Sequence, residues 1–303
     1  MTNNTNIKCT LCGCPKIELQ DYKIRNITDD SCKMYKCKNC ETHFMFPLPS
    51  QNLANYYDGT FREEVHTSKY YNYTELDKVF NNFSEEANLR VERVKKDLSP
   101  NDKVLEIGSS VGYFTVAISD YVHDVYATEW DSKARAYIQN RLSKYNINVA
   151  KNPEDFDTKF DKIFLFHVLE HIENPINFLK ILKRLLNENG KIYIEVPNVD
   201  DVMVKTFQCR PFIEHYYKKA HIFNFNEKGL KYIFEHVSFS DYDIKHIQRY
   251  NFSNNLYWLS DGSPSGRNSS IYNNIITTEL NNEYIKSLIA NKQTDTLFAI
   301  ASI

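Results

Sequence analysis

The chain has 303 residues, of which 42% are hydrophobic, and its formal net charge is -2. This composition excludes an intrinsically disordered chain, and the charge gives no reason to expect a nucleic-acid partner, which usually requires a basic face. The first residues, MTNNTN, lack the features of a secretory signal, and no apolar run approaches the roughly 20 residues that cross a bilayer. We therefore expect a cytoplasmic protein without a membrane span.

The cysteines are crowded at the N-terminus, where six of the seven precede residue 41. Two Cys-x-x-Cys pairs have the spacing with which two tight turns offer four thiolates to one tetrahedral ion. The pattern predicts a structural zinc ribbon over residues 1–50, and a closed four-thiolate shell argues against a catalytic zinc. The predicted ligands are Cys9, Cys12, Cys37 and Cys40. Two further cysteines, Cys14 and Cys32, keep an iron–sulfur cluster open as an alternative.

Residues 51–99 are expected to form a linker and a helical cap. Pro47 and Pro49 favour an extended start, and apolar residues recur at helical spacing from Leu76 to Leu98. This helix leads into the remainder of the chain.

From residue 100 to 303, short apolar strands alternate with helical segments, which predicts an α/β domain with a largely parallel sheet. We expect a helix that Asn174 caps, that starts at Pro175 and that Gly190 ends. Two insertions interrupt the alternation, a lid at about 198–226 and a second segment at about 251–291. The seven strands are expected at 104–107, 122–130, 147–150, 162–166, 191–196, 242–250 and 295–303.

The turn after the first of these strands reads Glu106-x-Gly108-x-x-x-Gly112. A dinucleotide fingerprint would need glycines where Ser110 and Tyr113 stand, and a pyrophosphate would be repelled by the acid. An ammonium group would not be repelled. About 20 residues further on, Glu129 ends the second strand, where folds of this kind place the acid that binds ribose. A nucleoside that carries an amino acid fits both features, so the sequence predicts S-adenosylmethionine as the cofactor.

The segments VLEIGSSVGYF, YATEWD, FDKIFLFHVLEHIENP and LKRLLNENGKIYIEVPN occur in the order and spacing of class I S-adenosylmethionine-dependent methyltransferases, which the chain resembles over roughly residues 100–200. The four-cysteine ribbon, the following P-x-P and the YY segment are similar to methyltransferases of sugar-nucleotide and surface-polysaccharide pathways. The resemblance implies a Rossmann-like seven-stranded sheet of order 3-2-1-4-5-7-6, with the last strand antiparallel.

The resemblance also implies positions for the cofactor. The acid and glycines of the turn would surround the methionine part, Glu129 would bind the ribose, and Glu154 or Asp155 would lie near the adenine. Tyr113 could face the sulfonium, although packing in a helix core is an equal alternative for its ring. The full predicted cofactor set is Glu106, Gly108, Ser109, Gly112, Tyr113, Phe114, Glu129, Trp130, Asp155, Phe166 and His167.

Methyl transfer to a sugar hydroxyl needs a proton acceptor, for which histidine is the first candidate. His221, at the end of the lid, is the preferred base, and His171, after the fourth strand, is the second candidate. His215 and Tyr216 could contact a sugar. Similar enzymes that methylate carbon carry an acid immediately before the histidine of the lid, where this chain has Ala220, so the sequence favours O-methylation.

The leading hypothesis is a methyltransferase that acts on a sugar hydroxyl of a nucleotide-sugar or a glycan precursor, a small-molecule or glycan acceptor. The alternatives are C-methylation of a nucleotide-linked keto-sugar, methylation of an rRNA base and a non-catalytic module that binds S-adenosylmethionine. The acidic balance argues against a nucleic-acid acceptor. The sequence does not indicate an oligomeric state.

Overall fold

The computed structural model describes residues 7–29, 31–48, 58, 75–263 and 270–303. Most of the expected linker and part of the second insertion lie outside these residues. The chain forms two compact units. The first unit comprises Met1–Pro49, Leu169–Asn177 and Ile194–Ile300, and the second comprises Ser50–Val168, Phe178–Tyr193 and Ala301–Ile303.

The N-terminal cysteine segment forms an antiparallel sheet in the first unit. Its strand order is β1-β2-β3-β9, with β1 at Ile17–Gln20, β2 at Lys33–Cys37, β3 at His43–Phe46 and β9 at Phe223–Asn224. The fourth strand, which the sequence did not predict, comes from the lid: Phe44 pairs with Phe223, and Met45 N–H donates to Ile222 O at 2.9 Å. The segment that carries His221 is therefore fixed to the cysteine-bearing sheet.

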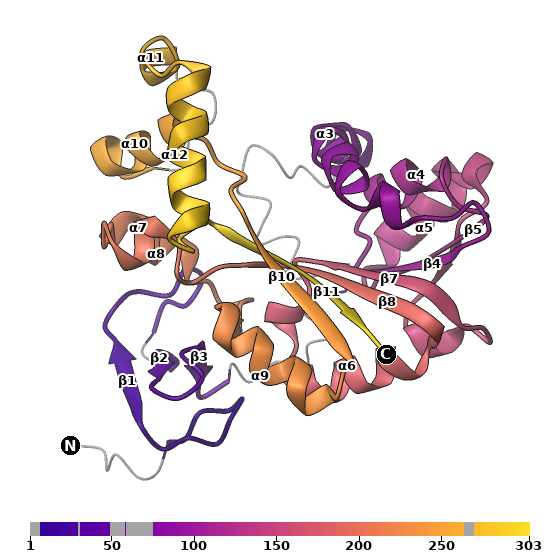
Figure 1. Ribbon diagram of the computed structural model, residues 1–303, viewed down its shortest axis with the longest axis horizontal. Coiled ribbons are helices and arrows are strands. Elements are labelled where there is room, and N and C mark those ends of the chain that lie inside the picture. The colour runs from indigo at the N-terminus through magenta and orange to yellow at the C-terminus, as the bar shows by residue number, and fades with distance from the viewer. Residues whose placement is uncertain (1–6, 30, 49–57, 59–74, 264–269) are drawn as a thin grey trace. The chain divides into compact units, whose positions relative to one another are not determined.

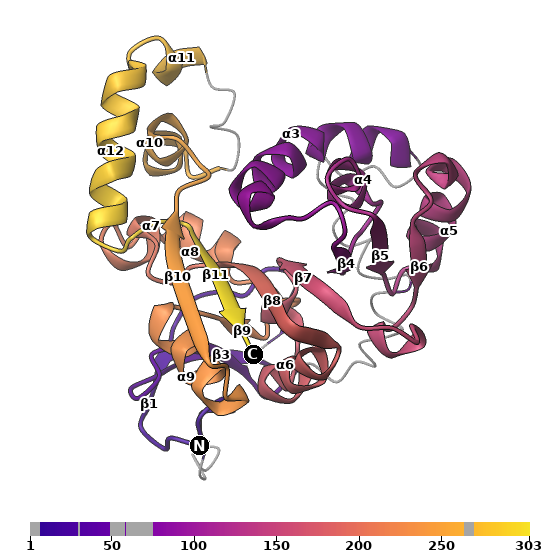
Figure 2. The same cartoon turned by 45° about the vertical axis from the view of Figure 1, so that its right-hand side comes forward.

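A seven-stranded sheet has the order β10-β11-β8-β7-β4-β5-β6. These labels number every strand of the chain, including the three N-terminal strands and β9. When only the strands of this sheet are numbered in chain order, the sheet reads 3-2-1-4-5-7-6 from β6 to β10. β4 pairs in parallel with β5 and β7, and β5 pairs in parallel with β6. The bounds are β4 Lys103–Ile107, β5 Asp124–Thr128, β6 Asn148–Ala150, β7 Phe160–Phe166, β8 Leu186–Pro197, β10 Asp241–Ile247 and β11 Thr296–Ser302. β10 and β11 run in opposite directions (Figures 1 and 2).

Helices of the second unit flank the strands that carry the glycine turn. α3 is the amphipathic helix that the apolar spacing predicted, and α3 and α4 lie side by side in both views (Figures 1 and 2). The α-helices of this unit are α3 Leu76–Val94, α4 Tyr113–Ser119 and α5 Ser132–Arg141, and α6 Pro175–Arg184 begins in the first unit and continues in the second. The 3-10 helices are η2 Lys95–Asp97, η3 Ser143–Tyr145 and η4 Pro153–Asp155.

The expected end of α6 was wrong. Asn174 caps the helix as predicted, because its Oδ1 accepts from Asn177 N–H at 3.0 Å, but the helix ends at Arg184 and Gly190 lies within β8. A Cβ at Gly190 would stand 2.9 Å from Asn187 O and from Leu186, so the glycine permits a close approach of backbone within the strand.

Both insertions contain more helix than the sequence suggested. The lid holds two short helices, and the second insertion begins with α10, which the sequence did not predict. The remaining helices are η5 Leu169–His171, α7 Val202–Lys205, α8 Arg210–Tyr216, α9 Glu227–Val237, α10 Phe252–Asp261, α11 Ser270–Asn273 and α12 Thr278–Ala290. Among the described helices, none combines the length and apolar character that a bilayer crossing requires.

Candidate functional site

The glycine turn of the second unit follows β4 directly. Gly108 has φ +70°, Ser110 has φ +53° and Gly112 has φ +80°, so three residues of this turn adopt the left-handed region. A Cβ at Gly108 would lie 2.8 Å from Val168 Cγ2, and one at Gly112 would lie 3.1 Å from Leu142 Cδ1. Both glycines are therefore required by the backbone and by the packing, while Gly108 itself remains exposed.

Glu129, immediately after β5, closes over this turn. Its Oε2 accepts from Ser110 N–H at 2.7 Å and its Oε1 accepts from Asp131 N–H at 2.9 Å. Ser109 N–H also donates to Thr128 O at 2.9 Å. Two predicted cofactor segments, the glycine turn and the end of the second strand of the domain, are thus joined at the carboxyl ends of neighbouring parallel strands, where α/β folds bind ligands.

Glu106 points into the protein beneath the turn. It is buried, and its Oε2 accepts a hydrogen bond from Thr115 Oγ1 on α4. Burial raises the pKa of the Glu106 carboxyl to about 7, although Thr115 and the guanidinium of Arg90 lower it. Arg90 reaches this region from α3, where it pairs with Glu86 at 2.8 Å and lies 4.4 Å from the centroid of the Phe166 ring.

The aromatic residues of the predicted cofactor set pack mainly within the second unit. Phe114 is fully buried, with its ring centroid 4.6 Å from Phe166 and 5.2 Å from Phe164. Tyr113 stacks on Phe83 of α3 at 5.4 Å. These contacts correspond to the alternative in which such rings stabilise the helix core.

The other predicted cofactor residues border the same strand ends. Trp130 is half-buried after β5, and Asp155 is exposed in η4, where its Oδ2 accepts from Asn152 N–H at 2.9 Å. His167 directly follows β7 and lies in the left-handed region, with φ +56°. A non-glycine residue in that region is uncommon and often marks a functional position.

The residues around the turn fit S-adenosylmethionine. The Ser109 hydroxyl is buried and has no hydrogen-bond partner within the part of the chain that the structure describes. A buried polar group without a partner is costly and marks a place where a ligand atom can bond. Gly108 offers an exposed backbone without a side chain, and Glu129 offers a carboxylate, so backbone approach, a hydroxyl and an acid are available together.

The four predicted zinc ligands lie together in the first unit. Their Sγ atoms are all within 4.8 Å of one another, with Cys9 and Cys40 at 3.7 Å and Cys12 and Cys37 at 3.4 Å. Zn–S bonds of about 2.3 Å in a tetrahedron separate the sulfurs by about 3.8 Å, so the set fits one zinc ion. Asn39 N–H donates to Cys37 Sγ at 3.3 Å, which is the backbone support expected around a ligating thiolate. Cys14 does not belong to this group of four cysteines.

The first unit also contains a buried carboxylate between two histidines. His221 Nε2 lies 3.8 Å from Glu170 Oε1, and His171 Nε2 lies 4.0 Å from the same atom. The two imidazole rings meet edge to face, with centroids 4.9 Å apart. His171 Nδ1 is 2.8 Å from Ala220 O; a carbonyl can only accept, so Nδ1 carries the proton and the lone pair is on Nε2. One carboxylate oxygen and two imidazole nitrogens could also hold a metal ion.

Both predicted base candidates thus meet at Glu170, which the sequence analysis did not select. His215 and Tyr216 lie on α8 of the same unit. Arg90 was also missed, because it reads as an ordinary charged position on an amphipathic helix. Its only sequence signal is a helix with Glu86 four residues earlier, a spacing that is common on solvent-exposed faces.

Residues 76–243 match the family described as "Methyltransferase domain". Two relatives are 29% identical: a tRNA U34 carboxymethyltransferase of Campylobacter hominis over 106 residues, and a probable S-adenosylmethionine-dependent methyltransferase of Mycobacterium tuberculosis over 98 residues. The matches cover 32% and 31% of this chain and 37% and 35% of those proteins, so the chain spans about a third of their length. A solved methyltransferase from Archaeoglobus fulgidus has 18% identity and a TM-score of 0.49, and covers 76% of this chain and 99% of that one.

The family match covers more than half of the chain and includes the glycine turn, Glu129 and η5. The seven-stranded sheet places the first two of these at the carboxyl ends of parallel strands, as a class I methyltransferase requires. The chain therefore belongs to the methyltransferase-domain family and carries the domain of an S-adenosylmethionine-dependent methyltransferase.

Proposed function

We propose that the protein transfers a methyl group from S-adenosylmethionine to a sugar hydroxyl of a nucleotide-sugar or a glycan precursor. The observation that carries this proposal is the cluster of Glu170, His171 and His221, a buried carboxylate with two imidazoles in contact. Such a cluster can remove the proton from a neutral hydroxyl, which is the group that a sugar acceptor offers.

The residues of the second unit would hold the cofactor. Gly108 would admit the amino-acid part to the backbone, the Ser109 hydroxyl would bond to it, and Glu129 would accept from the ribose hydroxyls. Bound S-adenosylmethionine supplies a methyl carbon that the sulfonium activates. Because the carbon is already activated, the protein mainly contributes orientation and a proton acceptor.

The first unit would supply that acceptor. The acceptor hydroxyl would give its proton to an imidazole Nε2 as its oxygen forms the new bond to carbon. The bond between Ala220 O and His171 Nδ1 supports this role, because it fixes the tautomer in which Nε2 is basic. The Glu170 carboxylate would stabilise the imidazolium that results, as an acid does in other carboxylate–histidine pairs.

We also propose that the four clustered cysteines bind a structural zinc ion. The sulfur separations and the Asn39 N–H bond to Cys37 support this assignment. Because all four ligands are thiolates, the ion would leave no position for water or acceptor, and its role would be to stabilise the sheet.

C-methylation of a keto-sugar is the second candidate function. The sequence argued against it because Ala220 precedes His221, whereas similar C-methylating enzymes have an acid there. Glu170 supplies a carboxylate 3.8 Å from His221 Nε2 from another element, which supports the removal of a proton from carbon beside a carbonyl.

RNA is a third acceptor class. The expectation that nucleic acid is not a partner gains no support from the relatives, since one of them is named as a tRNA-modifying enzyme. Against RNA stands only the net charge of -2, which disfavours a polyanionic substrate.

The test is methyl transfer from labelled S-adenosylmethionine to three acceptors: a mixture of nucleotide-sugars, the corresponding keto-sugars and bulk tRNA. We expect the label in a nucleotide-sugar as an alkali-stable O-methyl ether. A label on carbon, accompanied by solvent deuterium exchange beside the carbonyl, would replace the proposal by C-methylation. A label found only in tRNA would contradict both sugar hypotheses.

A further inference from the structure

Two cationic side chains leave the same face of a short backbone pairing in the first unit. The backbone N–H of Arg25 donates to Tyr217 O at 2.9 Å, and the backbone N–H of Lys219 donates to Arg25 O at 2.9 Å. Arg25 and Lys218 are therefore partners in an isolated parallel bridge. Directly paired residues of neighbouring strands project to the same side.

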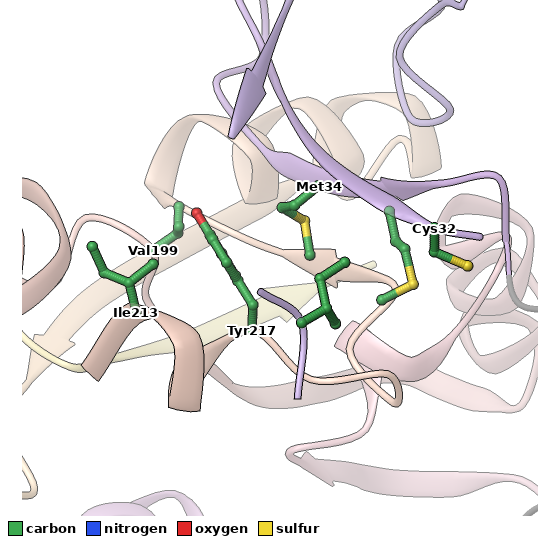
Figure 3. Packing of buried hydrophobic residues seen from close by; sticks show 7 residues of the cluster. Cys32, Met34, Val199, Ile213 and Tyr217 are labelled. Carbon is green, nitrogen blue, oxygen red and sulfur yellow. The ribbon is translucent and has the colours of Figure 1, made fainter. Parts of the chain in front are cut away.

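The opposite side of this pairing faces a hydrophobic core. Ile24 and Tyr217, the residues that precede the two cations, belong to a buried cluster with Met34, Val199 and Ile213 (Figure 3). Since neighbouring residues of an extended segment alternate in direction, the packing of Ile24 and Tyr217 turns Arg25 and Lys218 away from the core. Their backbone positions are therefore fixed by tertiary packing.

The two cations are half-buried without an acidic partner. Within the described residues, no carboxylate oxygen lies within 4.0 Å of the side-chain nitrogens of Arg25 or Lys218, and Arg25 Nε is buried without a hydrogen bond. The charge of Arg249 also lowers the pKa of Lys218. Unlike Arg25 and Lys218, Arg249 has acidic partners, because Glu195 and Asp295 lie 3.8 and 3.9 Å from its guanidinium. Burial of like charges without a counter-charge is unfavourable, so the arrangement calls for an anion.

The neighbours of the two cations allow an anion to approach. Arg25 Nη1 lies 3.0 Å from the ring nitrogens of His215, whose pKa is lowered to about 3 by burial and by the charges of Arg25 and Lys218. His215 is therefore neutral at pH 7 and adds no charge. Burial, followed by the charge of Arg25, lowers the pKa of Lys218 to about 8, so Lys218 still carries a proton at that pH.

The cations also lie near the proposed proton acceptor. The backbone N–H of His221 donates to the backbone O of Lys218 at 2.9 Å, so Lys218 and His221 close one tight turn. Tyr216, two residues before Lys218, has a buried hydroxyl with no hydrogen-bond partner in the described part of the chain. A ligand held by Arg25 and Lys218 would thus lie near the Glu170–His171–His221 cluster.

We propose that Arg25 and Lys218 form a binding site for the phosphate or diphosphate group of the acceptor. This inference rests on the proposed function, and it favours a nucleotide-linked sugar over an uncharged glycan. Guanidinium and ammonium groups side by side match the oxygens of a diphosphate, to which they can donate charge-assisted hydrogen bonds.

The test is calorimetric titration of the full chain with inorganic pyrophosphate at pH 7 in a phosphate-free buffer. We expect saturable binding, weakened about tenfold or more by Arg25→Gln and by Lys218→Gln, because each variant removes a charge-assisted bond. The matched control is Lys23→Gln, an exposed lysine two residues from Arg25, which should bind as the wild type does. Equal affinity in all four proteins, or no binding to the wild type, would overturn the proposal.

Two further titrations separate this inference from the proposed function. S-adenosylhomocysteine should bind all four proteins equally, which also shows that the variants are folded. If S-adenosylhomocysteine binds and pyrophosphate does not, the anion site is wrong and the methyltransferase proposal stands. If pyrophosphate binds and S-adenosylhomocysteine does not, the anion site stands and the methyltransferase proposal is wrong. A nucleoside diphosphate should bind at least as tightly as pyrophosphate, and tighter binding of an RNA oligomer that the two variants abolish would assign the site to RNA.

Discussion

Glu106 is a buried acid beneath the proposed cofactor turn, and its burial disfavours the charged form of its carboxyl. Its carboxyl is buried beneath the glycine turn and bonds to Thr115. Burial raises its pKa from 4.5 to about 7. Between these two values the folded protein holds a proton that the unfolded chain has released, so the free energy of unfolding must fall as the pH rises.

The Glu106→Gln variant should lack this dependence. Over the interval from pH 5 to pH 8 we expect its free energy of unfolding to rise by about 3 kcal/mol relative to the wild type, the equivalent of the shift in pKa. Urea denaturation at several pH values measures the difference. Glu154→Gln, at an exposed acid of η4, is the control and should follow the wild type. A constant difference between Glu106→Gln and wild type would contradict the buried, protonated carboxyl.

The two histidines beside Glu170 can be separated by substitution. The one that accepts the proton should lose about 10²- to 10⁴-fold in kcat when it is replaced by glutamine, whereas the other should lose much less. Affinity for S-adenosylhomocysteine should not change in His171→Gln or His221→Gln, because the proposed cofactor residues belong to the other unit. His236→Gln, on the exposed face of α9, is the control. Full activity in both variants would remove histidine from the mechanism.

Among single residues, the sequence could predict those whose type and position follow from local motifs. Glu106, Gly108 and Glu129 lie at strand ends that a pattern of apolar runs can locate. Glu170 and Arg25 were missed because their roles depend on partners 51 and 193 residues away, His221 and Lys218, and no local pattern encodes such distances.

Among the elements, the turn between β4 and α4 depends most on glycine. Gly108 combines a left-handed backbone with a space that Val168 Cγ2 occupies, since a Cβ would approach to 2.8 Å. The two costs are physically distinct, because shortening Val168 removes the clash and leaves the backbone strain unchanged.

A double-mutant cycle separates them. Gly108→Ala should destabilise the protein by about 1–2 kcal/mol from strain alone, with an additional cost from the clash. Val168→Ala should recover only the additional part, which gives a favourable coupling between the two substitutions. Chemical denaturation of the four proteins measures it. Strict additivity would show that Val168 does not limit the space at Gly108.

The strands of the seven-stranded sheet were predictable because continuous apolar runs bounded by polar residues describe buried parallel strands. The end of α6 was not, because Gly190 has the composition of a helix terminus while it serves a close contact inside β8. α10 was missed because its buried face includes Ser253, Asn254 and Asn255, and polar residues hide the apolar period of the helix.

At the scale of the whole chain, the cysteine-bearing sheet is completed by a strand from a segment some 180 residues later. β9 begins two residues after His221 and pairs with β3, so the order of this sheet and the position of His221 are linked. Sequence alone could not show this pairing, because a two-residue strand has no detectable period.

Removal of the proposed zinc ion should therefore affect catalysis without affecting the cofactor. We expect Cys12→Ser, or treatment with a strong chelator, to lower the thermal stability and the rate of methyl transfer while S-adenosylhomocysteine still binds. Cys209→Ser is the control, because Cys209 lies outside the cluster. Loss of cofactor binding together with activity would contradict this separation, as would a chelated protein of unchanged activity and stability.

The central claim is that the second unit binds S-adenosylmethionine at the turn that Glu129 closes. Calorimetric titration of the folded, metal-quantified protein with S-adenosylhomocysteine, beside the Glu129→Ala variant, tests it most directly. We predict saturable micromolar binding to the wild type that weakens at least tenfold in the variant, because the acid fixes Ser110 and would also accept from the ribose hydroxyls. A folded wild-type protein that does not bind S-adenosylhomocysteine would contradict the account, and so would a Glu129→Ala variant that binds it as tightly as the wild type does.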